Sequence, residues 1–284
     1  MTRTDQRSVS TVGLPSVTAT VKFGAEVEGR ARYDSYEREK TNLALVTDQI
    51  EIFDARPVLG TLSLEANGFE LLEHTSEHAD STDLEVLDTA YHADMIELIR
   101  RVSGTPHVLP QRSGLLLRRA DGTIAEKVAK PAGFAHLDYT ENSASLIADL
   151  VREAEDRDGV IPPGCTFAII QTWRVVSAPE HDTVLAVCDG RTVQEPYWIV
   201  ADSVIGPEDV PGNKLELRLG TPSPDQGWFY FSGMTSSEVL VFNGFDSRRP
   251  DEVNVLHTSF RVPETGVPLH PRASIEARFV AYFA

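Results

Sequence analysis

The sequence is poor in cysteine and has no long apolar run. Only Cys165 and Cys188 occur among 284 residues, and neither belongs to a metal-binding cysteine spacing. We therefore expect two reduced thiols in the core and a cytoplasmic protein, since disulfide-stapled secreted chains are richer in cysteine. No stretch of about 18 apolar residues occurs, so we expect no membrane span. The first residues lead into no apolar segment of the kind found in secretory signals.

Positive charge is also scarce. The chain has 26 Lys and Arg against 43 Asp and Glu, a formal net charge of −17. Such a field repels a phosphate backbone and an anionic membrane surface, so we expect neither a nucleic acid nor a membrane as a partner. A small anionic ligand is compatible with this charge, because one buried arginine can dominate locally. We expect a small-molecule substrate, and the sequence leaves a homo-oligomer open.

The composition is that of an ordinary globular domain, with 41% apolar and 24% charged residues. The length suits one large domain, and no linker, internal repeat or low-complexity segment interrupts it. We therefore predict a single domain over residues 1–284, in which residues 1–15 form a flexible leader.

Short strand-like segments dominate the second half of the chain. Gly, Pro, Asp or Asn separate them, as at Asp189-Gly190 and Asn243-Gly244. The segments are 167–176, 184–188, 197–205, 215–219, 228–231, 239–242, 255–260 and 275–283. Many short strands at fairly even spacing predict a β sandwich or barrel, with its core at about residues 107–284.

Two helices flank these strands. The first begins at Asp88, shows apolar residues on one helical face, and ends at Gly104. The second has Asn142 or Ser143 as its N-cap and ends at Asp158-Gly159. The predicted fold class is therefore mainly β with flanking helices.

A His-x-Asp tripeptide is the first candidate for chemistry. His136 and Asp138 are two residues apart, so on a β-strand both side chains point to the same face and can reach one metal ion. Two histidines and one carboxylate form the facial triad of non-haem iron(II) oxygenases, which leaves three positions of the metal open. His257 is the best third ligand, because it lies in a late strand among apolar neighbours.

An arginine and a serine open the last predicted strand. Arg272 can bind a carboxylate with two charge-assisted hydrogen bonds, and the hydroxyl of Ser274 shares its face. This pair suits the distal carboxylate of 2-oxoglutarate, whose other end can chelate iron. Arg278 lies on the same face by parity and is a rival for this role, with an ion pair to a metal ligand as its alternative.

A strand farther upstream offers weaker candidates. Arg174 either pairs with an acid such as Asp189 or faces the pocket and contacts the cosubstrate or substrate; the sequence does not decide between these. Tyr139, Thr172 and Trp173 are candidates for lining the substrate pocket.

The chain resembles a family of iron(II)- and 2-oxoglutarate-dependent oxygenases of the CmcJ and NvfI type, which act in natural-product biosynthesis as hydroxylases and desaturases. The resemblance extends from about residue 60 to the end of the chain. The segments that carry it are His136-Leu137-Asp138-Tyr139-Thr140, Gln171-Thr172-Trp173-Arg174, Leu185-Ala186-Val187-Cys188-Asp189, Ser237-Glu238-Val239-Leu240-Val241-Phe242, His257-Thr258-Ser259-Phe260 and Arg272-Ala273-Ser274-Ile275-Glu276-Ala277-Arg278.

This resemblance implies a double-stranded β-helix, the cupin-like jelly roll. It implies iron bound by His136, Asp138 and His257, and 2-oxoglutarate held by the region of Arg272. The implied enzyme is a dioxygenase that uses Fe(II), 2-oxoglutarate and O2 to hydroxylate, desaturate or cyclise a small specialised metabolite. Two alternatives remain: a cupin-like metalloenzyme that does not use 2-oxoglutarate, and a non-catalytic β-sandwich binding module.

Overall fold

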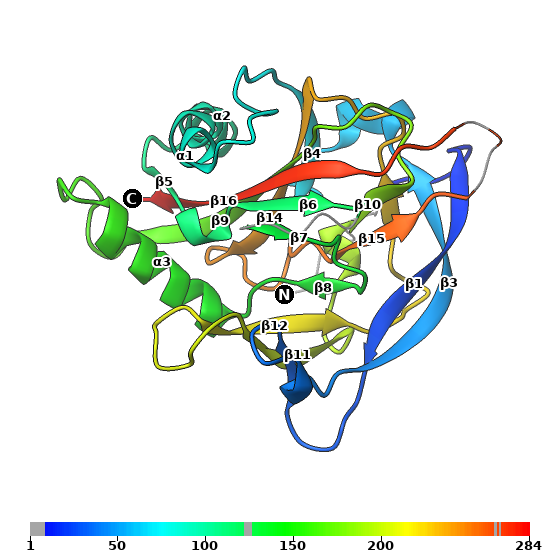
Figure 1. Cartoon of the computed structure of the whole chain (residues 1–284), viewed down its shortest axis with the longest axis horizontal. Helices are drawn as coiled ribbons and strands as arrows, with labels where there is room; N and C mark the ends of the chain where they lie inside the picture. The colour runs from blue at the N-terminus through cyan, green and yellow to red at the C-terminus, as the bar shows by residue number, and fades with distance from the viewer. Residues whose placement is uncertain (1–8, 122–126, 264–265, 267) are drawn as a thin grey trace, which may run out of the picture.

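Two β-sheets face each other and form most of the molecule (Figure 1). The computed structural model describes residues 9–121, 127–263, 266 and 268–284. The nine-stranded sheet contains, in spatial order, β1 (Ser16–Ala25), β3 (Ala44–Asp54), β13 (Trp228–Tyr230), β10 (Thr183–Cys188), β15 (His257–Arg261), β8 (His136–Leu137), β12 (Lys214–Gly220), β11 (Trp198–Val204) and β2 (Ala31–Asp34).

The second sheet has seven strands. In spatial order these are β4 (Phe69–Glu73), β14 (Glu238–Asp246), β9 (Thr166–Val175), β16 (Ala273–Phe283), β6 (Leu116–Arg119) and β7 (Val128–Ala129), while β5 (Val108–Pro110) pairs with the end of β16. Most neighbouring strands are antiparallel, and many neighbours in space, such as β9 and β16, are distant in sequence. This is the arrangement of a jelly roll, and the prediction of a mainly β fold with flanking helices is confirmed.

Period-two alternation divides the residues of the second sheet between two faces. Trp173 and Val175 of β9 join Val187 and Phe229 of the other sheet in the core between the sheets. Ile170 of β9 lies on the opposite face, in a cluster covered by a helix. The inner face of each strand therefore lines the space between the two sheets, and this is where the candidate site lies.

The helices pack on the outside and at one end of the sheets (Figure 1). α1 (Leu84–Val86) runs through a π-helical turn, Leu87–Tyr91, into α2 (His92–Ser103), and Gly104 ends α2 with φ 74°. α3 is Glu141–Glu155. Short 3-10 turns occur at Arg38–Lys40, Arg56–Thr61, Arg112–Gly114 and Gly190–Thr192.

Two helix boundaries differ from the prediction. The first helical run begins at Leu84 rather than Asp88, because the side chain of Asp83 accepts from the N–H of Glu85 and caps it. The N-cap of α3 is Thr140 rather than Asn142 or Ser143. The hydroxyl of Thr140 accepts from the N–H of Ser143, whose own hydroxyl accepts from the N–H of Thr140, so Ser143 completes a capping box.

The part of the chain before residue 107, where the predicted β core begins, also contributes strands to the two sheets. Residues 1–8 of the predicted leader lie outside the described part of the chain. Val9 donates its N–H to Asp189, and both Val9 and Leu14 pack against the core between the sheets. β1 to β4 are integral strands of the two sheets. No helix in the described ranges is long and apolar enough to cross a membrane.

Candidate metal centre

His136 and Asp138 lie at the end of a very short strand. β8 contains only His136 and Leu137, and it is held between β15 and β12 by the pairs His257↔His136 and Leu219↔His136. Leu137 points to the opposite face and is fully buried in the outer core. This anchoring fixes His136 on the inner face, and Asp138 follows it before the Thr140 cap of α3 begins.

His257 is brought beside His136 by direct strand pairing. It is the first residue of β15, and the two imidazole rings have centroids 4.4 Å apart. Nε2 of His136 lies 3.4 Å from Oδ1 of Asp138, and Nε2 of His257 lies 3.9 Å from Oδ2 of Asp138. One ligand atom from each residue lies within 4.8 Å of the others, as a shared metal ion requires.

The backbone holds both histidines in the tautomer that a metal needs. Nδ1 of His136 is 2.9 Å from the carbonyl oxygen of Phe134, and Nδ1 of His257 is 3.1 Å from that of Val255. A carbonyl only accepts, so each Nδ1 carries the proton and each Nε2 offers its lone pair to the centre. The donor set and its orientation therefore fit a divalent metal such as iron(II).

The electrostatics favour the same protonation states. Burial, together with the neighbouring His136, lowers the pKa of His257 to about 4. Burial alone would raise the pKa of Asp138, but Arg278 and the two histidines outweigh it and hold that pKa well below the ordinary value. Near neutral pH His257 is thus neutral and Asp138 ionised, which is the state that binds metal ions.

Arg278 holds the carboxylate ligand in place. Its Nη2 donates to Oδ2 of Asp138 at 3.1 Å, and its Nη1 donates to the carbonyl oxygen of Gly114 at 2.9 Å. A side chain added at Gly114 would press on the stem of Arg278, since a Cβ there would lie 3.0 Å from Cδ. Of the two roles that the sequence allowed for Arg278, the ion pair to a metal ligand is the one that the geometry favours.

Arg272 and Ser274 are buried without partners for several of their polar atoms. Arg272 is 2% exposed, and its Nε and Nη1 have no hydrogen-bond partner in the described residues; the same is true of the Ser274 hydroxyl. The guanidinium of Arg272 lies over the ring of Trp173, 5.2 Å from its centroid. Unpaired buried donors are costly, so this pair fits a ligand that brings a carboxylate.

His136, His257, Arg272 and Arg278 line one small pocket, with a cavity volume of about 10 Å³. His136 and His257 lie on one wall and Arg272 and Arg278 on the other. The same pocket is lined by Arg118 and Glu276, which the sequence interpretation did not select. Glu276 shares the parity of Ser274 and Arg278, and this was the signal that could have identified it.

The remaining candidates lie elsewhere in the fold. Arg174 is on the outer face of β9 and donates to the carbonyl oxygens of His74 and Ser236, so neither metal ligands nor Asp189 are among its partners. Thr172 shares this outer face, where its hydroxyl donates to the carbonyl oxygen of Ala277. Asp189 pairs with Arg191 instead.

Tyr139 and Trp173 lie inside the fold. Tyr139 is buried and its hydroxyl donates to Oε1 of Gln111 at 2.8 Å. Trp173 is 2% exposed and contacts Arg272, while its indole N–H has no partner among the described residues. Of the residues proposed to line the substrate pocket, these two are on the inner side with the metal ligands.

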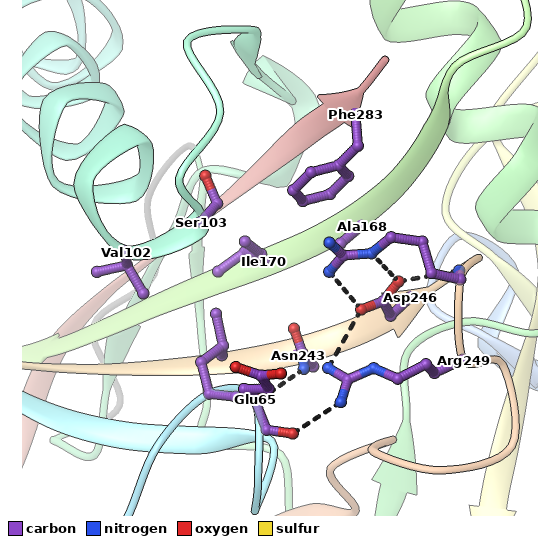
Figure 2. Close-up of a pocket in the computed structure, with 11 residues that line it drawn as sticks. Glu65, Val102, Ser103, Ala168, Ile170, Asn243, Asp246, Arg249 and Phe283 are labelled. Atoms are coloured by element: carbon purple, nitrogen blue, oxygen red, sulfur yellow. Dashed lines mark hydrogen bonds and ion pairs between the residues drawn. The ribbon is translucent and has the colours of Figure 1, made fainter.

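A larger cavity, of about 320 Å³, lies on the outer face of the second sheet and is lined by none of the candidate residues. Figure 2 shows Asp246, Arg249 and Phe283 around it. Its two arginines both pair with Asp246: Arg248 donates to both carboxylate oxygens, and Nη2 of Arg249 lies 3.6 Å from Oδ2. Among the described residues, the unpaired buried nitrogens of Arg272 lie in the pocket with His136 and His257 instead.

The fold and the triad define a metal-dependent oxidoreductase of the jelly-roll class, and comparison with known proteins agrees. The family model described as "Oxidoreductase/YMDC permease-like domain" matches residues 23–282. Because the match covers most of the chain, the protein belongs to this family.

Relatives of similar length carry oxygenase names. The hydroxylase/desaturase efuI of Hormonema carpetanum is 26% identical over 295 residues, covering 96% of this chain and 97% of that relative. The Fe(II)/2-oxoglutarate-dependent dioxygenase nvfI of Aspergillus novofumigatus is 24% identical over 253 residues, covering 86% of each. The resemblance drawn from the sequence is therefore confirmed.

The solved structures agree on the fold. The iron and alpha-ketoglutarate-dependent endoperoxidase NvfI superimposes with a TM-score of 0.76 at 22% identity, over 95% of this chain and 98% of that one. At this level of identity the likeness establishes the shared jelly roll.

Proposed function

We propose that this protein is a non-haem iron(II)- and 2-oxoglutarate-dependent dioxygenase that hydroxylates, desaturates or cyclises a small specialised metabolite. The observation that carries the proposal is the pairing of a three-ligand metal site with buried Arg272 in the same pocket, where two nitrogens of that arginine have no partner among the described residues. The names of the relatives support it.

Each group has a distinct role in this proposal. His136, Asp138 and His257 hold iron(II), and Arg278 orients Asp138. When bound, the iron, 2-oxoglutarate and O2 supply the oxidising chemistry.

A second set of residues holds the cosubstrate. Arg272 and Ser274 bind the distal carboxylate of 2-oxoglutarate, and Trp173 supports the Arg272 guanidinium. The buried inner faces of the two sheets exclude water from the reacting atoms.

One anaerobic experiment tests the proposal. Fe(II) is added to the metal-free protein and then 2-oxoglutarate, and the visible charge-transfer band of the iron–2-oxoglutarate chelate is recorded. We expect stoichiometric iron and the band. Iron binding without the band would favour a cupin-like metalloenzyme that does not use 2-oxoglutarate. A protein that takes up no iron would favour a non-catalytic β-sandwich binding module.

We also propose a cytoplasmic location, which the free thiols of Cys165 and Cys188 support. Fractionation of the producing cells tests it, and recovery of the protein outside the cytoplasm would contradict it. Homo-oligomerisation stays a prediction that sedimentation analysis of the purified protein can decide.

A further inference from the structure

A second carboxylate-bearing residue besides Asp138 lines the wall where the cosubstrate would lie. Ser274, Glu276 and Arg278 alternate along β16, so Glu276 shares the inner face with the other two and stands between them. It lines the same pocket as Arg272. An anionic cosubstrate that reaches from the metal to Ser274 has to pass this carboxylate, and two like charges in a buried space repel strongly.

Arg118 neutralises this carboxylate from the neighbouring strand. β6 pairs with β16 through Arg118↔Ser274. Nε of Arg118 donates to Oε1 of Glu276 at 3.0 Å and Nη2 donates to Oε2 at 3.2 Å, so both carboxylate oxygens are engaged. The side chains are 15% and 18% exposed, which places the pair away from bulk water.

Glu276 is also a competitor for the candidate cosubstrate arginine. Burial lowers the pKa of Arg272 to about 10, and among the surrounding charges Glu276 opposes this effect most strongly. Yet Arg272 keeps Nε and Nη1 without a partner in the described residues. Glu276 does not form a hydrogen bond with Arg272 because Arg118 already donates to both of its carboxylate oxygens.

We propose that Arg118 is a positioning residue for the cosubstrate: by engaging both oxygens of Glu276, it keeps Arg272 open for a ligand carboxylate and shields that ligand from Glu276. This inference rests on the proposed function, since it concerns how 2-oxoglutarate is accommodated. It adds a residue from outside the His-x-Asp and Arg-x-Ser segments.

Arg118 has a second contact, which defines the competing structural role. Its Nη1 donates to the carbonyl oxygen of Lys130 at 3.0 Å, on the segment that leads to β8 and His136. If this contact were its main task, losing Arg118 would disturb His136 whatever residue 276 is. If the shielding role is correct, removing the charge of Glu276 makes Arg118 dispensable.

The test is a double-mutant cycle on the full chain, read by anaerobic titration of the iron–2-oxoglutarate charge-transfer band and, separately, by iron stoichiometry. In Arg118→Gln we expect the Kd for 2-oxoglutarate to rise about tenfold or more, because the freed Glu276 captures Arg272. In the double variant Arg118→Gln with Glu276→Gln we expect recovery to within about threefold of the wild type. Iron stoichiometry should stay unchanged in both.

Arg119→Gln is the matched control. Arg119 is the adjacent residue on β6, and its Nη1 donates to the carbonyl oxygens of Arg118 and Ser274; within the described ranges it donates to no carboxylate. This variant loses the same charge and should keep the wild-type Kd.

Three results overturn the inference. They are an unchanged Kd in Arg118→Gln, an equal loss in the single and double variants, and an equal loss in the Arg119→Gln control. Failure of the proposed function itself looks different, because the wild-type protein would then show no charge-transfer band at all.

Discussion

Nη2 of Arg278 lies 3.1 Å from Oδ2 of Asp138, while Oδ1 of the same carboxylate lies 3.4 Å from Nε2 of His136. The arginine thus engages Oδ2, which lies 3.9 Å from Nε2 of His257, and leaves Oδ1 facing His136. A metal ligand supported in this way keeps its charge and its orientation before the metal arrives. Arg278 therefore belongs to the candidate metal centre through its contact with Asp138.

Replacing Arg278 by Met should weaken iron binding by about 10- to 100-fold, because Asp138 loses the group that orients it. The metal-free protein should also lose about 3–5 kcal/mol of stability, since a buried carboxylate is left unpaired. Anaerobic Fe(II) titration and urea unfolding measure the two effects. Arg248→Met is the control: it breaks an arginine pair with buried Asp246 outside the site, so it should cost stability and spare iron.

Replacing His257 by Ala should abolish stoichiometric iron binding, because two ligands remain of three. Iron per chain after anaerobic loading and desalting measures this. His78→Ala, in the polar loop before α1, should retain the wild-type iron content. Equal iron in His257→Ala and the wild type would show that the metal lies elsewhere.

Arg272→Met should separate stability from cosubstrate binding. The variant removes a buried guanidinium in which two nitrogens have no partner in the described part of the chain, so we expect the metal-free protein to gain about 1–3 kcal/mol of stability. The same variant should bind 2-oxoglutarate much more weakly while binding iron normally. Thermal unfolding and the charge-transfer titration check the two statements. Unchanged 2-oxoglutarate affinity would assign the distal carboxylate to another residue.

His92 should make stability depend on pH. Burial lowers the pKa of His92 below 6.5, and its Nε2 has no hydrogen-bond partner in the described residues. Below pH 6.5, His92 is protonated in the unfolded chain but stays neutral in the folded chain. The free energy of unfolding therefore falls as the pH drops towards the lowered pKa of His92. His92→Phe, which keeps a ring against Phe279, should flatten this dependence in urea unfolding between pH 7.5 and about 5. Parallel curves for the two proteins would contradict it.

Much of the site could be predicted from spacing alone. Residues two apart on a strand point to the same face. The sequence therefore predicted that His136 shares a face with Asp138, and Arg272 with Ser274. The apolar surroundings of His257 indicated a buried imidazole, and the structure pairs it directly with His136.

Other features needed the fold. Alternation shows that Trp173 and Arg174 point to opposite faces of β9, but not which face is inside; the packing of α2 against the outer face decided that. The N-cap of α3 is Thr140, two or three residues before the predicted Asn142 or Ser143. The difference arises because the position of the cap depends on the turn after Asp138. The Arg118–Glu276 pair joins strands 158 residues apart in sequence, and no periodicity within either strand predicts it.

The sequence by itself determined the ligand types, their faces on each strand and the mainly β class, because these follow from side-chain chemistry and a period of two. The tertiary structure alone decided which of the inner-face arginines serves which carboxylate. Arg278 donates to Asp138 and lies 3.8 Å from Glu276, Arg118 donates to both oxygens of Glu276, and Arg272 keeps two nitrogens without a partner in the described residues. That choice depends on strand pairing and on which charges a buried pocket leaves without a partner, and both are properties of distant segments brought together.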